Sequence, residues 1–111
     1  MVISIDDFEK VDIRVGKIID VQDFPNAKKP AYQLTIDFGS EIGIKHSSAQ
    51  ITTLYSKDEL VGKQILAVVN FPPRQIANFF SEVLVLGLKQ SDGSVALIEP
   101  EREVALGIKM S

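Results

Sequence analysis

The stretch that decides the fold, residues 32–55, reads YQLTIDFGSEIGIKHSSAQITTLY. Apolar and polar residues alternate over residues 32–38, which is the period of a half-buried β-strand. The turn residues Gly39-Ser40-Glu41 lead into a second alternating run, residues 42–46, and the two runs predict a β-hairpin. A serine cap and apolar residues at helical spacing then predict a short helix over residues 48–55.

Further strand-like runs flank this stretch on both sides. Residues 12–21 read as a long strand whose alternation changes parity at Gly16, which predicts a β-bulge there. Residues 65–69 and 83–88 are apolar on both faces. One face of each run therefore lines the core, and the other is covered by another subunit or by the chain's own tail. The turn residues 91–94 predict a second hairpin near the C-terminus.

The order of these elements predicts an all-β fold. Three strands, one helix and two further strands are the order of a five-stranded OB-fold Greek-key barrel. A β-sandwich usually needs more strands and no helix in mid-chain. Ser4 and Asp7 form a capping arrangement that predicts a short N-terminal helix, and a C-terminal hairpin and tail extend the barrel. No linker interrupts the sequence, so residues 1–111 form a single domain.

Composition excludes several classes of function. The chain has no cysteine, and its single histidine, His46, forms neither a zinc site nor a nucleophile–base pair. No glycine-rich phosphate loop is present. We therefore expect a protein that is not an enzyme, with no catalytic residues, no metal and no cofactor. The net charge of −3 restricts any nucleic-acid site to a local patch.

The N-terminus does not resemble a secretory signal. The N-terminus has acidic residues where a secretory signal has a basic and then an apolar region. No apolar run approaches the roughly 20 residues that a membrane helix needs. We expect a cytoplasmic protein that does not insert into a membrane.

A second distinctive stretch, residues 68–88, reads VVNFPPRQIANFFSEVLVLGL. Three of the six phenylalanines, Phe71, Phe79 and Phe80, lie in or beside a proline-stiffened loop over residues 71–80. Such rings either plug the core or bind a partner. Phe79 and Phe80 point to opposite faces if the segment is extended, so both cannot easily be buried.

Several segments carry a resemblance to a known family. Residues 12–18, DIRVGKI, resemble the opening of the tRNA-binding domain appended to bacterial methionyl- and phenylalanyl-tRNA synthetases. NFPPRQI at residues 70–76 and SEVLVLG at residues 81–87 are similar to the stand-alone CsaA-like secretion chaperones, as are GIK and SSAQI within residues 43–51. The resemblance covers nearly the whole chain. It implies an OB-fold homodimer without enzymatic activity that binds tRNA, exported preproteins or unfolded peptides.

Two hypotheses of function follow. The first is an export-related chaperone, a homodimer that binds unfolded preprotein or signal-containing peptides. The sequence leaves open whether the protein translocation machinery is also a partner. Its predicted peptide contacts are Phe71, Pro72, Arg74, Ile76, Phe79, Phe80 and Glu82. The alternative is a structure-selective tRNA-binding module. Its predicted contacts are Lys17, Lys45, Asn70, Arg74 and Ser81.

Some of these residues also have a purely structural interpretation. Arg14 and Asp12 have the same strand parity and suit an ion pair. Asn70 and Ser81 either bond each other's backbone or contact a nucleotide. Lys17, Lys45 and Lys63 form a positive face or are ordinary surface lysines, and Glu82 suits a basic peptide residue. The apolar tail, residues 104–108, adds to the expectation of a dimer.

Overall fold

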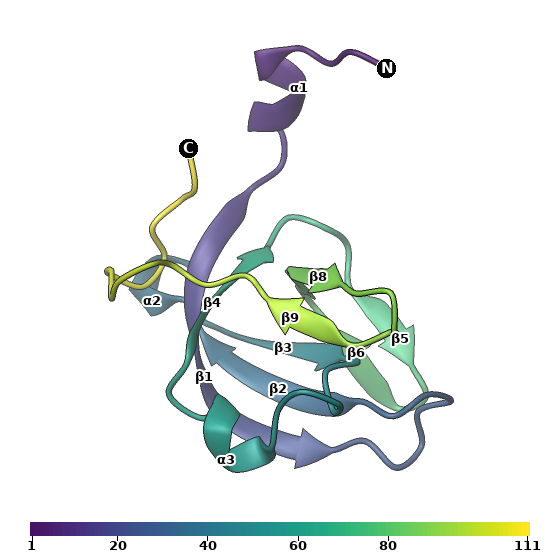
Figure 1. Ribbon diagram of the computed structural model, residues 1–111. Helices are drawn as coiled ribbons and strands as arrows, with labels where there is room; N and C mark the ends of the chain where they lie inside the picture. The colour runs from purple at the N-terminus through teal and green to yellow at the C-terminus, as the bar shows by residue number, and fades with distance from the viewer.

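A five-stranded antiparallel sheet forms the centre of the protein, in the computed structural model that describes all 111 residues (Figure 1). The strand order is β3-β2-β1-β4-β7. The sheet is nearly closed, because the backbone N–H of Glu82 donates to the carbonyl oxygen of His46 at 2.7 Å, joining β3 to the chain before β7. The strands are β1 (Ile13–Asp23), β2 (Tyr32–Asp37), β3 (Ile44–Ala49), β4 (Gln64–Val68) and β7 (Leu84–Val85). The predicted OB-fold barrel is confirmed.

Three short helices and two small hairpins surround the barrel. The N-terminal helix has the predicted capping box between Ser4 and Asp7, and it stands apart from the barrel (Figure 1). No helix is long and apolar enough to span a membrane. The helices are α1 (Ile5–Glu9), α2 (Gly39–Ile42) and α3 (Lys57–Leu60). The hairpins are β5 (Arg74–Ile76) with β6 (Phe79–Ser81), and β8 (Gly87–Lys89) with β9 (Val95–Leu97).

The helix between the third and fourth strands lies later in the chain than predicted. Ser48 is not a helix cap, because it continues β3 and pairs with Gln33 of β2. Its backbone N–H donates to the hydroxyl of Ser81 at 3.0 Å. The helix α3 instead begins after Ser56, whose hydroxyl accepts from the backbone N–H of Glu59. Strand pairing therefore takes precedence over the local capping signal.

The predicted bulge at Gly16 is also misplaced. The register of β1 against β2 shifts between Ile18 and Asp20, beyond the glycine. Gly16 is required for a different reason. A Cβ at this position would lie 2.6 Å from side-chain atoms of both Ile36 and Phe38, which is closer than packed carbon atoms approach.

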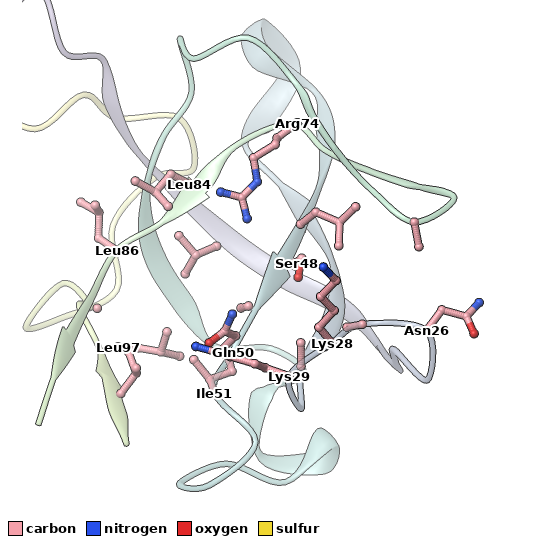
Figure 2. Close-up of a pocket in the computed structure, with 18 of the residues that line it drawn as sticks. Asn26, Lys28, Lys29, Ser48, Gln50, Ile51, Arg74, Leu84, Leu86 and Leu97 are labelled. Carbon is pink, nitrogen blue, oxygen red and sulfur yellow. The ribbon is translucent and has the colours of Figure 1, made fainter. Parts of the chain in front are cut away.

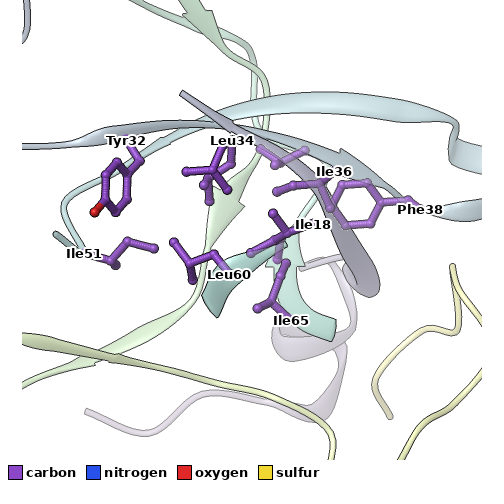
Figure 3. Packing of buried hydrophobic residues seen from close by; sticks show 11 residues of the cluster. Ile18, Tyr32, Leu34, Ile36, Phe38, Ile51, Leu60 and Ile65 are labelled. Atoms are coloured by element: carbon purple, nitrogen blue, oxygen red, sulfur yellow. The ribbon is translucent and has the colours of Figure 1, made fainter. Parts of the chain in front are cut away.

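The parity change along β1 marks two separate apolar clusters. Ile18 faces the barrel interior, which holds Leu34, Ile36, Phe38 and Ile65 at full burial (Figure 3). The opposite face of the sheet carries a smaller cluster, against which two tail residues pack. That smaller cluster contains Ile13, Val15, Leu66 and Val68, and the tail residues are Val104 and Leu106. The sequence left open whether another subunit or the chain's own tail covers the outer face of β4. In the structure, the chain's own tail packs on that face.

Candidate functional site

The largest concave feature is a groove of about 760 Å³ at one end of the barrel. The hairpin β5–β6, the loop after β1, the end of β3 and the segment from β7 to β9 form its walls (Figure 2). Eleven of its nineteen lining residues are apolar, and all eleven are alanine, valine, leucine or isoleucine. The groove can therefore bury apolar side chains of a ligand, and each square ångström buried contributes roughly 25 cal/mol.

The charged residues of the groove all have the same sign. Lys28, Lys29 and Arg74 line it, and no aspartate or glutamate does. Figure 2 shows Arg74 extending from one edge into the groove, with Leu84 and Leu86 along one wall and Lys28 on the other side. None of the three cations forms an ion pair within the chain.

A smaller cavity of about 280 Å³ adjoins the groove. The two adjoin at Ser48, Arg74, Ile76 and Leu84, which line both, and together they are called the depression. The smaller cavity adds Phe71, Pro72, Ser81, Glu82 and Val83. Beside the aliphatic groove, this cavity therefore offers one aromatic ring and one carboxylate.

The segment predicted as a loop over residues 71–80 is largely a β-hairpin. Arg74 pairs with Ser81 and Ile76 pairs with Phe79. The turn contains Ala77 in the left-handed region, with φ of 54°. Alternation of apolar and polar residues could not predict these strands, because each is only three residues long.

The three phenylalanines of this segment have different environments. The ring of Phe79 is half-buried and packs on Phe24, with ring centroids 5.4 Å apart, and on His46. Phe80 points to the other face and is 57% exposed, as the opposite-face argument predicts. Phe71 is 49% exposed and lines the smaller cavity. It is therefore not a core plug.

The structure brings together most of the residues predicted to bind peptide. Phe79 and Phe80 line neither the groove nor the smaller cavity. The other five do surround the smaller cavity, and they are Phe71, Pro72, Arg74, Ile76 and Glu82. This cavity is only one end of the whole depression.

Glu82 is already bound within the chain. One carboxylate oxygen, Oε1, accepts from the backbone N–H of His46 at 2.9 Å and lies 3.1 Å from Nδ1 of the same residue. These contacts attach the segment before β7 to β3. They engage one of the two oxygens of the carboxylate that was expected to hold a basic residue of a peptide.

The residues predicted to bind tRNA are dispersed over the surface. Arg74 and Ser81 share the smaller cavity. Lys17 lies in a polar recess that also contains Glu99 and Glu101. Lys45 lies on β3, where it pairs with Ile36 of β2. Lys63, the third lysine of the expected positive face, pairs with Glu99 at 3.2 Å. The structure does not gather these lysines into one positive face.

Asn70 and Ser81 do not bond to each other's backbone, so that prediction is wrong. The Asn70 side chain accepts from the backbone N–H of Asp12 at 3.0 Å and donates to the carbonyl oxygen of Lys10 at 2.7 Å. It therefore anchors the start of β1 to the end of β4. The hydroxyl of Ser81 instead accepts from Ser48, a lining residue of the groove.

The predicted pair of Arg14 and Asp12 is confirmed, with Nε and Oδ1 2.6 Å apart. The hydrogen bond to Asp12 raises the pKa of Arg14 above its ordinary value. Arg14 also donates to the carbonyl oxygen of Gly107 at 3.0 Å. This ion pair therefore helps to hold the C-terminal tail on the barrel.

One wall of the groove, the hairpin β8–β9, is fixed at its turn. Oδ1 of Asp92 accepts from the hydroxyl of Ser94 at 2.6 Å and from its backbone N–H at 2.9 Å. These hydrogen bonds, the hydroxyl bond first, lower the pKa of Asp92. Ser94 is buried, and its hydrogen bonds with Asp92 fix the shape of the turn.

Sequence reasoning missed several residues of the groove. Lys28 and Lys29 belong to the loop between β1 and β2, and two adjacent lysines between Pro25 and Pro30 were the available signal. The aliphatic residues had no signal beyond strand periodicity. They include Ile51, Leu84, Leu86 and Leu97.

Comparison with known proteins places this chain in a family. The model of the family described as "Putative tRNA binding domain" matches residues 13–109. The methionine–tRNA ligase of Bacteroides fragilis is 41% identical over 105 residues, which are 95% of this chain and 15% of that enzyme. The chain thus spans about one seventh of the curated relatives that it matches.

Two solved structures match over essentially their full length. The chaperone CsaA from Bacillus anthracis is 47% identical with a TM-score of 0.94, and the match covers 100% of both chains. The CsaA chaperone protein from Picrophilus torridus is 57% identical with a TM-score of 0.92, covering 99% of this chain and 100% of that one. The chain therefore belongs to the tRNA-binding domain family and is a CsaA-like member of it.

Proposed function

We propose that this chain is a non-enzymatic chaperone that binds extended segments of unfolded proteins, including exported preproteins, in the groove. The observation that carries the proposal is the lining of that groove, in which eleven of nineteen residues are aliphatic. Apolar burial is non-directional, so such a surface accepts many sequences at modest affinity. The likeness to two CsaA chaperones supports the same function.

The proposed assembly is a homodimer. The support is a set of exposed apolar side chains near the two chain ends, among them Ile3 and Ile5 at 60% and 72% exposure and Ile108 at 48%. The tail gives less support than expected, because Val104 and Leu106 pack on the barrel of their own chain. Light scattering at micromolar concentration is expected to give twice the chain mass of 12.2 kDa. A monomer mass would contradict the proposal.

The second candidate function is tRNA binding. The family description, the relatives among methionine–tRNA ligases and the cations of the groove favour it. Single-stranded RNA is usually bound by stacking bases on aromatic rings in a positive groove. No aromatic ring lines the main groove, and only Phe71 lines the smaller cavity. This arrangement supports weak, salt-sensitive RNA binding more than a dedicated RNA site.

One titration separates the two functions. The protein is titrated with tRNA and with an unfolded preprotein peptide, from low to physiological salt. We expect peptide binding to persist, because apolar burial does not depend on released counterions. We expect tRNA binding to fall steeply as the salt rises. RNA binding that survives physiological salt, without peptide binding, would reverse the order of the two functions.

The proposed place of action is the cytoplasm, where unfolded preproteins are available before export. The translocation machinery is then the proposed recipient of the bound chains. Affinity capture from cytosol, with and without ribonuclease, tests both points. Capture of preproteins that resists ribonuclease supports the proposal, and capture that ribonuclease abolishes contradicts it.

A further inference from the structure

We propose that the groove selects peptide segments in which aliphatic side chains are flanked by carboxylates, and discriminates against segments flanked by basic residues. The inference rests on the proposed peptide-binding function and adds the class of peptide. It predicts that acidic, aliphatic segments of an unfolded chain are bound better than the basic start of a secretory signal.

The first argument is the distribution of charge. The chain has 15 acidic and 12 basic residues, yet the groove contains three cations and no acid. Lys28, Lys29 and Arg74 are exposed and form no ion pair with the chain's own carboxylates. Their charges are therefore available to a ligand. A peptide carboxylate would pair with them, whereas a peptide lysine would be repelled.

The second argument concerns the carboxylate of the adjoining cavity. Glu82 is the only acidic residue that lines either part of the depression. Its Oε1 accepts from the backbone N–H of His46 and lies beside the His46 ring, so this oxygen already has partners. Arg74 borders the same cavity without forming an ion pair with Glu82, so the depression contains three cations and one carboxylate. The depression as a whole therefore favours an anion.

The third argument distinguishes a peptide from a nucleic acid. The walls that face the cations are built from branched aliphatic residues such as Ile51, Leu84 and Leu97. These side chains interdigitate with Leu, Ile and Val of a peptide but offer no flat platform for a base. A ligand that carries both carboxylates and aliphatic groups matches the cations and the aliphatic walls of the groove.

Free amide groups complete the match to a polypeptide. Asn26 and Gln50 line the groove, and their side chains make no hydrogen bond within the chain. Each amide offers a donor and an acceptor, which suits the alternating N–H and C=O groups of an extended backbone. Such contacts do not depend on the peptide's sequence.

The test compares three synthetic peptides that share one aliphatic core and differ only in their flanks. The flanks are Asp and Glu, Ser and Gln, or Lys. Fluorescence anisotropy with the full-length protein at low salt is expected to give about tenfold tighter binding for the acidic peptide than for the basic one. The ratio is expected to shrink toward one as the salt rises, because exposed charges are screened.

Two triple variants localise the effect. Lys28→Gln with Lys29→Gln and Arg74→Gln removes the cations of the groove. The matched control removes three exposed lysines elsewhere that also form no ion pair, namely Lys17→Gln, Lys89→Gln and Lys109→Gln. Both variants have the same net charge. Only the groove variant is expected to lose the preference for acidic flanks, and circular dichroism of both checks the fold.

The outcomes separate this inference from the proposed function. Equal affinity for all three peptides, or tightest binding of the basic one, overturns the inference and leaves peptide binding intact. Failure of every peptide to bind overturns both. If tRNA binds through the same three cations while the acidic peptide does not bind, the groove is an RNA site and the inference is wrong. Equal effects of the two triple variants also contradict it.

Discussion

Replacement of Leu84 with aspartate is expected to weaken binding of an unfolded aliphatic peptide by about tenfold or more. Leu84 lines both the groove and the adjoining cavity and is 50% exposed in the free protein. Burying the remaining half of a leucine side chain contributes about 1 kcal/mol, and placing an unpaired carboxylate against a ligand's apolar groups costs more. Isothermal titration with one peptide measures the loss.

The matched control is Leu88→Asp. Leu88 is 61% exposed and lies on β8 outside the groove, so the same chemical change occurs at a similar exposure. The peptide affinity of this variant is expected to stay within about twofold of the original, because Leu88 does not line the groove and sites without shared partners couple weakly. Equal losses in the two variants would show that the groove is not where the peptide binds.

Replacement of Phe38 with alanine is expected to lower the free energy of unfolding by about 3–5 kcal/mol. Phe38 is fully buried, and its ring occupies the space that the missing side chain of Gly16 leaves open. The cavity left behind cannot collapse easily, because Gly16 lies in β1, which is paired on both sides. The total free energy of unfolding of a native protein is about 5–15 kcal/mol, so this loss would be a large fraction of it.

Urea denaturation followed by circular dichroism measures this loss as a lower midpoint with little change in slope. Phe80→Ala serves as the control, because the ring of Phe80 is 57% exposed. That variant is expected to change the free energy of unfolding by less than about 0.5 kcal/mol. Similar effects of the two substitutions would contradict the packing described here.

The strands of the barrel were predictable because one face of each is buried in a continuous core. The alternation over residues 32–38 corresponds to β2, whose buried residues Tyr32, Leu34 and Ile36 face the interior. The doubly apolar run over residues 65–69 was also informative. It corresponds to β4, which separates the two apolar clusters.

The features that sequence reasoning misplaced depend on partners distant in the chain. Ser48 reads locally as a helix cap, but its backbone N–H bonds to Ser81 and its strand pairs with β2. Gly16 reads as a bulge, but the glycine is required by Ile36 on the neighbouring strand β2 and by Phe38 just after that strand. A local pattern cannot report such a constraint, because the atoms that impose it come from other segments.

The candidate site was predictable only in part for the same reason. Phe71, Pro72 and Arg74 are contiguous in the sequence and lie together in the structure. Lys28 and Lys29 meet Arg74 only because the loop after β1 folds across the end of the barrel toward β5 (Figure 2). The paired lysines between two prolines stand out in the sequence, but nothing in the sequence places them beside Arg74.

Nuclear magnetic resonance of labelled methyl groups tests the central claim most directly, because it locates the bound peptide on the full-length protein. Titration with an unfolded aliphatic peptide is expected to shift the methyl signals of Ile76, Leu84 and Leu97, which line the groove. The signals of Leu54 and Val61, exposed elsewhere on the surface, are expected to stay in place. Shifts confined to residues outside the groove, or none at saturating peptide, would contradict the account.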